Sequence, residues 1–187
     1  RKESSAASDV YKRQLNRGRV IPYMGLLHQE YSLYPHRTIL GNLTDAISLE
    51  LPAEFAKIKA IHVLTTVGFD ENIAEGLLNK YPDELSVGEK HRVALAQVLI
   101  KEPKIIILDE PTVGLDPKQI IEIRQLIKEL GKNHTVILSS HILSEVNAVC
   151  DYVLIIDKGT LVAEDTPEHL SEDFSDTDSI ILSLIHI

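Results

Sequence analysis

The stretch Lys104–Pro117 reads Lys-Ile-Ile-Ile-Leu-Asp-Glu-Pro-Thr-Val-Gly-Leu-Asp-Pro, and it decides the predicted fold. Its apolar run Ile105–Leu108 leads directly into two adjacent carboxylates, Asp109 and Glu110. A short, continuous apolar run favours a strand buried on both faces of a parallel sheet. Ligands of open α/β sheets bind at the carboxyl ends of the strands. Because neighbouring strand residues point to opposite sides, we expect one carboxylate to reach a metal ion and the other to face a water.

Composition sets broad limits on the class of protein. The chain has 187 residues, of which 44% are hydrophobic and 25% charged, as in an ordinary globular domain. The net charge of −9 argues against a nucleic-acid partner, whose binding surface would be basic. The lone cysteine, Cys150, excludes an internal disulfide. No apolar run approaches the roughly 20 residues of a membrane-spanning helix.

Working outward, the periodicity predicts a helical block inserted into an α/β protein. A mixed apolar strand over Arg19–Leu27 comes before the block. The helical spacing of apolar residues then continues over Thr38–Leu51, Ala53–Val67, Glu71–Lys80 and Ser86–Lys101. Strands and helices alternate afterwards: a helix over Asp116–Leu130, a strand over Thr135–Ser139, a helix over His141–Val149, strands over Tyr152–Ile156 and Leu161–Ala163, and a short helix from Thr166. We therefore expect a sheet part at about 15–32 and 103–166, a helical part at 33–102, and a short helix with an acidic, disordered tail at 167–181.

Four short motifs occur in order after Gln29: Leu85-Ser-Val-Gly-Glu89, Ile107-Leu-Asp-Glu-Pro111, Gly114-Leu-Asp-Pro117 and Ser139-Ser-His141. Together, over roughly residues 18–170, they resemble the nucleotide-binding domain of ABC ATPases. The resemblance implies a partial P-loop NTPase (RecA-like) sheet with an ABC-type helical subdomain inserted. It also implies ATP and Mg²⁺ as cofactors, a second ABC ATPase protomer and a membrane permease as partners, and a place on the cytoplasmic face of the cell membrane.

The same resemblance assigns roles at the strand ends. Asp109 would hold Mg²⁺ through its water shell, and Gln29 would complete that shell. Glu110 would be the general base for the attacking water, and His141 would contact the γ-phosphate. Taken alone, Gln29 is an ordinary polar loop residue and His141 an ordinary helix-start residue.

Further roles fall on two helix starts. Ser86, Gly88 and Glu89 would bind the γ-phosphate of ATP held by the opposite protomer, since helix N-termini favour anions. Asp116 would communicate across the dimer at the same ATP. Without the family, Ser86 and Asp116 are helix caps, and Ser86 with Glu89 forms a capping box. The family commonly has Gln at position 89, and a carboxylate there weakens anion binding unless it folds back onto the cap.

One family feature is absent from the sequence. A P-loop needs Gly-x-x-x-x-Gly-Lys-Ser/Thr, and no two of the nine glycines are five residues apart. We expect the P-loop and its strand to precede this chain in a longer protein. The chain alone should neither bind ATP tightly nor hydrolyse it, and Thr135–Ser139 should be left with an unpaired edge.

The two ends look foreign to the protein. Asp9–Gln14 and Leu182–Ile187 can be encoded by DNA strings that are reverse complements of each other and resemble the transposase end sequence of sequencing libraries. We therefore expect residues 1–14 and 182–187 to be translated adapter, outside the fold.

Finer resemblances divide the chain. The stretches His28–Thr38 and His91–Pro103 look like component A2 of the methyl-coenzyme M reductase system. Val113–Arg124 and Ser139–Val146 look like ATPases of ABC-2-type exporters. Three hypotheses follow: an exporter ATPase, a soluble ABC ATPase that remodels a protein partner, and a non-functional chimera joined within Leu108–Pro111.

Overall fold

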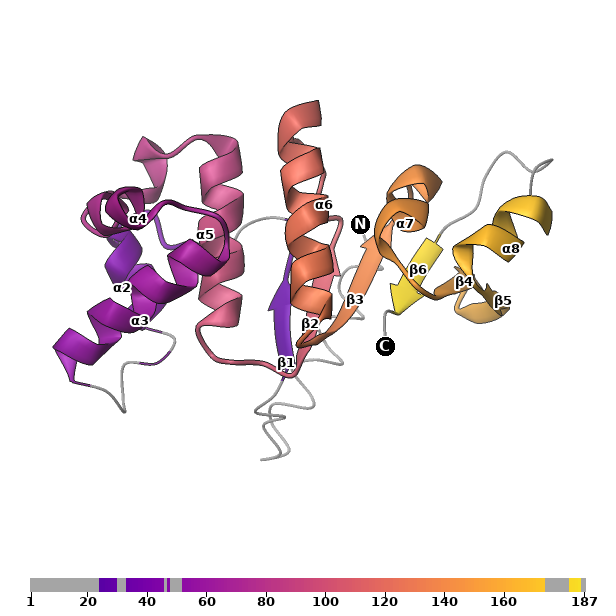
Figure 1. Cartoon of the computed structure of the whole chain (residues 1–187), viewed down its shortest axis with the longest axis horizontal. Helices are drawn as coiled ribbons and strands as arrows, with labels where there is room; N and C mark the ends of the chain where they lie inside the picture. The colour runs from indigo at the N-terminus through magenta and orange to yellow at the C-terminus, as the bar shows by residue number, and fades with distance from the viewer. Residues whose placement is uncertain (1–23, 30–32, 46, 48–51, 174–181, 186–187) are drawn as a thin grey trace.

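The computed structural model describes residues 24–29, 33–45, 47, 52–173 and 182–185. Within these residues, six strands form one sheet in the order β1-β2-β3-β6-β4-β5. Figure 1 shows helices α2 to α5 gathered beyond the β1 end of the sheet, with α6 lying across β2 and β3. The predicted α/β class is therefore confirmed. Over this described part of the chain, no helix combines the length and apolarity needed to cross a membrane.

Three parallel strands form one half of the sheet: β1 (Met24–Leu27), β2 (Ile105–Asp109) and β3 (Thr135–Ser140). Leu27 is in register with Leu108, and Asp109 with Ser139. Residues of β2 alternate between buried and half-buried. One face of the strand is therefore less deeply covered than the predicted burial on both faces implies. The strand predicted over Arg19–Leu27 is observed at 24–27, and residues 19–23 lie outside the described residues.

The helical block follows the predicted periodicity with shorter elements. It consists of α2 (Ile39–Thr44), α3 (Ala53–Thr66), α4 (Glu71–Leu77), a 3-10 turn (Pro82–Glu84) and α5 (Val87–Leu99). The helices predicted over residues 53–67 and 86–101 are thereby confirmed, whereas α2 and α4 end before the predicted Leu51 and Lys80. The boundaries of the sheet and helical parts remain a prediction.

The second half of the chain adds α6 (Pro117–Gly131), α7 (Leu143–Val149), β4 (Val153–Asp157), β5 (Thr160–Asp165) and α8 (Pro167–Asp173). The prediction that a helix begins at His141 is wrong by two residues. Ile142 is extended and is the N-cap, and the Ser140 hydroxyl accepts a hydrogen bond from its N–H. The acidic tail predicted as disordered is helical as far as Asp173, and residues 174–181 lie outside the described part.

A short strand, β6 (Leu182–Ile185), overturns the prediction of an unpaired strand edge. It lies between β3 and β4 and pairs antiparallel with both, matching Ile137–Ser140 on one side and Leu154–Ile155 on the other. The edge of Thr135–Ser139 is therefore not unpaired. Residues 182–185 pair within the sheet, and the adapter origin of 182–187 stays a prediction. The reason is physical: backbone N–H and C=O groups need partners, and a short extended segment can supply them whatever its origin. Residues 1–14 lie outside the described residues.

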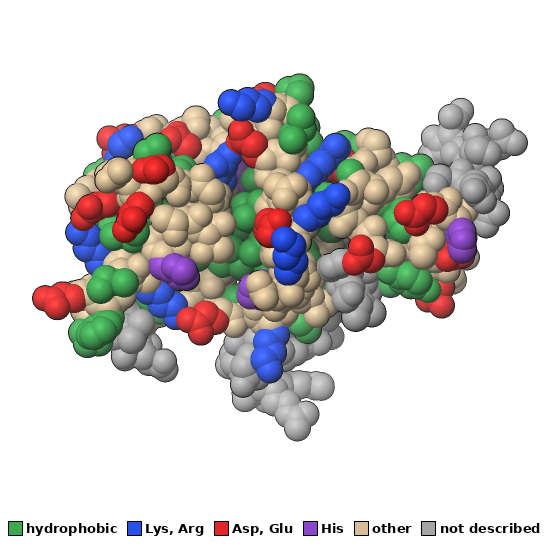
Figure 2. All heavy atoms as spheres, viewed as in Figure 1, with side chains coloured by type: hydrophobic (Ala, Val, Ile, Leu, Met, Phe, Trp, Pro, Cys, Tyr) green, Lys and Arg blue, Asp and Glu red, His purple; other side chains and the backbone are tan. Residues whose placement is uncertain are grey.

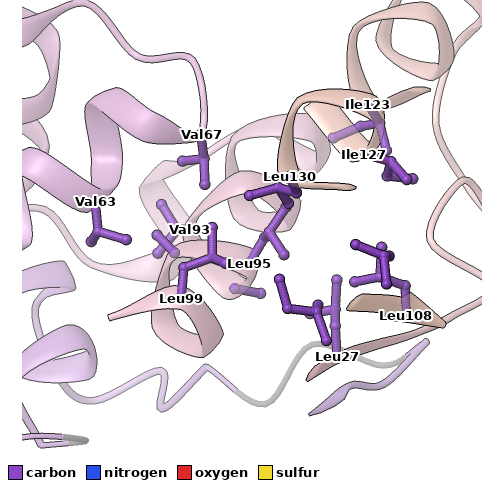
Figure 3. Packing of buried hydrophobic residues seen from close by; sticks show 14 of the residues in the cluster. Leu27, Val63, Val67, Val93, Leu95, Leu99, Leu108, Ile123, Ile127 and Leu130 are labelled. Atoms are coloured by element: carbon purple, nitrogen blue, oxygen red, sulfur yellow. The ribbon is translucent and has the colours of Figure 1, made fainter. Parts of the chain in front are cut away.

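One contiguous apolar core joins the helical block to the sheet. Figure 3 shows Leu95 of α5 on the side of the strand residue Leu27, while Val93 of the same helix lies toward Val63 and Val67. In the same view Ile123, Ile127 and Leu130 of α6 close the core from above the sheet. This packing fixes α5 and α6, whose first residues include four of the predicted site residues.

His91 is a buried polar residue in this core, on α5. Burial, and then the charge of Arg92, lower the pKa of His91 to about 4. The folded state therefore favours the neutral ring, and its contribution to stability is complete above about pH 6.5, the ordinary histidine value. Stability from this residue is lost as the pH falls from 6.5 toward 4, by roughly 3 kcal/mol in total.

We expect His91→Leu to flatten the dependence of the free energy of unfolding on pH between 6.5 and 4, measured by urea unfolding. The exposed His62 offers a matched control, because His62→Leu should leave that dependence as in the parent. Equal slopes for the parent and His91→Leu would show that this ring is not buried in its neutral form.

The position of β6 predicts that removing residues 182–187 will destabilise the sheet. Ile137–Ser140 and Leu154–Ile155 would lose their backbone partners, and exposed strand edges promote aggregation. We expect a lower Tm and larger particles in light scattering. Deleting only His186 and Ile187, which follow β6, is the matched control and should change neither. A deletion of all six residues that stays monomeric at the parental Tm would rule out a structural role for β6.

Candidate functional site

The carboxyl ends of three adjacent parallel strands carry the predicted site residues. Asp109 is the last residue of β2 and lies in register with Ser139 of β3. Glu110 and His141 follow these two residues by one and two positions. Gln29 is exposed and follows the end of β1 by two residues, on the same edge because β1 and β2 are parallel. The pairing thus delivers Gln29, Asp109, Glu110 and His141 to one edge of the sheet.

Asp109 is oriented by the neighbouring strand. The Ser139 hydroxyl donates a hydrogen bond of 2.5 Å to Oδ1 of Asp109. This bond occupies one oxygen of a half-buried carboxylate and fixes its plane. A single oriented carboxylate suits Mg²⁺, which commonly takes one or two carboxylates and completes its octahedron with waters and substrate phosphates.

Glu110 contacts His141 directly. Oε1 of Glu110 lies 2.8 Å from Nδ1 of His141, while Oε2 is buried and has no hydrogen-bond partner among the described residues. The hydrogen bond to Glu110, followed by the charge of that carboxylate, raises the pKa of His141 above its ordinary value. The protonated ring carries N–H donors on both nitrogens, so Nε2 can donate to an anion while Nδ1 stays on Glu110.

The backbone at Glu110 is strained. Its φ of 48° lies in the left-handed region, which residues with a Cβ enter at a cost. The N–H of Glu110 donates to the carbonyl of Ser139, and its own carbonyl accepts from Val113. The direction of the Glu110 side chain is therefore set by this turn and not by the alternation along β2.

Ser86 and Glu89 form the predicted capping box at the start of α5. Oε2 of Glu89 accepts hydrogen bonds from the N–H of Ser86 at 2.8 Å and from its hydroxyl at 2.7 Å. These two bonds, from the side chain first, lower the pKa of Glu89. The carboxylate thus folds back onto the helix cap, the one arrangement in which we expected it to leave the helix start open to an anion.

Gln119 joins the starts of α5 and α6. It completes the capping box of Asp116, whose Oδ1 accepts from the Gln119 N–H at 2.9 Å. Its side chain also packs against Gly88, because a Cβ built there would lie 2.6 Å from Nε2 of Gln119. Ser86, Gly88, Glu89 and Asp116 thereby form a second group. Within the described residues, no hydrogen bond or ion pair links this group to Glu110 and His141.

Sequence reasoning missed three polar residues in and near these groups: Ser139, Gln119 and Glu145. Ser139 stands in the Ser-Ser-His motif, but its bond to Asp109 depends on strand register, which the sequence leaves open. Gln119 shows a usable signal, since Asp116-x-x-Gln119 has the spacing of a capping box. Glu145 shows no local signal, because its partners lie in other elements.

The described residues fit Mg²⁺ and the terminal phosphate of a nucleotide. They contain no cluster of three His, Cys, Asp or Glu side chains that could hold a metal by itself. Figure 2 shows acidic and basic side chains interspersed over the face it displays. Cradling the inner phosphates needs a P-loop, and no glycine pair of this sequence has that spacing.

Known proteins are similar to this chain in both sequence and fold. The family profile described as "ABC transporter" matches residues 9–113. An uncharacterized ABC transporter ATP-binding protein of Methanocaldococcus jannaschii, MJ1242, is 51% identical over 158 residues, which cover 83% of this chain and 29% of that protein. The glutamine transport ATP-binding protein GlnQ of Geobacillus stearothermophilus is 37% identical, over 78% of this chain and 59% of its own length.

Solved structures agree. CbiO1 of Clostridium perfringens, part of the ABC transporter complex cbiONQ, superposes with a TM-score of 0.70 and 31% identity, over 83% of this chain and 61% of its own. The ATP-binding cassette MJ0796, solved as a dimer bound to ADP and Pi, gives 0.66 and 27%, over 78% and 63%. The chain spans less than two thirds of each of these four relatives. A profile match over more than half of the chain, together with these folds, shows that the chain belongs to the ABC transporter family, as part of an ATP-binding domain.

Proposed function

We propose that the chain is part of the ATP-hydrolysing subunit of an ABC transporter, acting as a dimer on a membrane permease. The observation that carries the proposal is the 2.8 Å contact between Glu110 and His141 beside the oriented carboxylate of Asp109. These three residues would supply a general base (Glu110), a positively charged hydrogen-bond donor (His141) and a metal-binding carboxylate (Asp109) at one edge of the sheet. This combination suits phosphoryl transfer to water.

The proposed chemistry divides among these side chains. Asp109 would hold Mg²⁺, with Gln29 beside it on the edge, and the metal would supply positive charge that offsets the charge of the phosphate oxygens. Glu110 orients the attacking water and accepts its proton. His141 donates from Nε2 to the terminal phosphate, because the contact with Glu110 favours its protonated form.

The second group acts on the ATP of the partner protomer. The N–H groups at the start of α5 favour an anion. The hydroxyl of Ser86 already donates to Glu89, so its bond to a phosphate requires that Glu89 release it. Gln119 bonds to Asp116 and packs against Gly88, so Asp116 lies close to the start of α5. From there Asp116 would communicate between the two protomers of the dimer.

The direction of transport follows the relatives. Those with a named substrate include glutamine, arginine and methionine transport ATP-binding proteins, the last described as import proteins. These names favour an importer of a small polar solute over the exporter expected from Val113–Arg124. The subunit then sits on the cytoplasmic face of the membrane, held there by its permease.

A soluble ABC ATPase that remodels a protein is the second candidate. MJ1242 is 51% identical, but this chain covers only 29% of it, which leaves room for a further cassette in the same protein. That length supports the resemblance to component A2. The match covers 83% of this chain, so it crosses Leu108–Pro111 and supports one continuous gene rather than a chimera.

Turnover belongs, in this proposal, to a longer protein that includes a P-loop, and the present chain is inactive alone. In that longer protein Glu110→Gln should retain ATP binding but lower kcat by about 10² to 10⁴, since the amide keeps the shape and cannot accept a proton.

Phosphate release and equilibrium ATP titration measure the two quantities separately. Glu164 of β5 is exposed, and Glu164→Gln is the matched control that should leave both unchanged. Turnover of Glu110→Gln within a few-fold of the parent would remove Glu110 as the base. The permease-linked and soluble candidates are distinguished by whether the protein co-purifies with a membrane protein.

A further inference from the structure

Glu145 of α7 is a buried carboxylate to which the proposed chemistry gives no role. We propose that Glu145 is a positioning residue that fixes Glu110 relative to His141, by holding the turn after β2 to the last residue of β3. The inference rests on the proposed function, in which Glu110 and His141 act on one phosphate.

Two hydroxyl groups from different segments converge on the same oxygen of Glu145. The Thr112 hydroxyl donates to Oε2 at 2.6 Å, and the Ser140 hydroxyl donates to it at 3.1 Å. Thr112 lies two residues after Glu110, and Ser140 directly precedes His141. All three side chains are buried, so water does not compete for these bonds. One carboxylate oxygen therefore ties the turn that carries Glu110 to the strand end that carries His141.

The other oxygen of Glu145 faces the guanidinium of Arg124 on α6, at 3.6 Å. Nε of Arg124 is buried and has no hydrogen-bond partner in the part of the chain that the structure describes. The ion pair is therefore incompletely satisfied, and a buried pair of this kind is weak support for stability. Apolar residues of the same volume would fill this space at a lower desolvation cost. The arrangement is better explained by the geometry that it imposes on Thr112 and Ser140.

Glu110 needs such an anchor because of its backbone. Its left-handed φ of 48° is held on one side by the bond from its N–H to the Ser139 carbonyl. On the other side the turn closes through Val113 N–H, and the side chain of Thr112 inside that turn is fixed by Glu145. Without the second anchor, the turn is free to relax and carry Glu110 away from His141.

The pKa of His141 can be used to detect its contact with Glu110 in the absence of nucleotide. We expect NMR titration of His141 in the full chain to give a pKa above the ordinary value of about 6.5. Glu110→Gln sets the value for complete loss of the contact. Thr112→Val removes one hydroxyl and no charge, and it should move the pKa of His141 toward the Glu110→Gln value. Ser140→Ala should act in the same direction.

Glu145→Gln removes the proposed positioning residue itself, but it also removes a charge that acts on His141. The test of the proposal therefore depends on Thr112→Val and Ser140→Ala, which change no charge. The matched control is Thr44→Val on α2, which removes a hydroxyl bonded to the Leu40 carbonyl and should leave the pKa of His141 at the parental value. Circular dichroism identifies which variants fold, and any folded neutral variant tests the proposal.

An unchanged pKa of His141 in folded Thr112→Val or Ser140→Ala would overturn the positioning role. An equal change in Thr44→Val would also overturn it, by showing a general loss of stability. No hydrolysis enters the measurement. A longer protein that fails to hydrolyse ATP would count against the proposed function and leave this inference standing.

Discussion

The parallel pairing of β2 with β3, with Asp109 opposite Ser139, is the constraint on which the rest of the site depends. It places the Ser139 hydroxyl on Asp109 and lets the Ser139 carbonyl accept from the Glu110 N–H. It also brings His141 within hydrogen-bond distance of Glu110. A slip of one residue in this register would turn Asp109 and Leu108 to the wrong faces, because side chains alternate along a strand. Packing of Leu108 and Leu138 in the core therefore also fixes the chemistry at the edge.

Negative charge is concentrated at this edge, and each carboxylate has a nearby hydrogen-bond or ion-pair partner. Asp109, Glu110 and Glu145 all lie near the ends of β2 and β3, in a chain with a net charge of −9. Each is held differently: Asp109 by a hydroxyl, Glu110 by an imidazole, and Glu145 by two hydroxyls and Arg124. An incoming Mg²⁺ would relieve the remaining repulsion, which suits a site whose substrate carries the metal with it.

Sheet continuity depends on a segment that contributes nothing to the proposed chemistry. The strand β6 connects the parallel half of the sheet to β4 and β5. It runs antiparallel to β3 and β4, which therefore share one direction. Backbone pairing on both sides therefore places residues 182–185 within the sheet.

The sequence by itself determined the elements whose causes are local. The apolar run before Asp109 predicted β2, the Ser-x-x-Glu spacing predicted the cap at Ser86, and Pro117 predicted the cap at Asp116. Ordered motifs predicted which side chains belong to the candidate site. Only the tertiary structure decided the pairs that are distant in sequence: Ser139 with Asp109, Thr112 with Glu145, and Gly88 with Gln119. Register and helix packing set these contacts, and both arise from core side chains spread over the whole chain. The same holds for β6, because the slot that receives it exists only once β3 and β4 lie in one sheet.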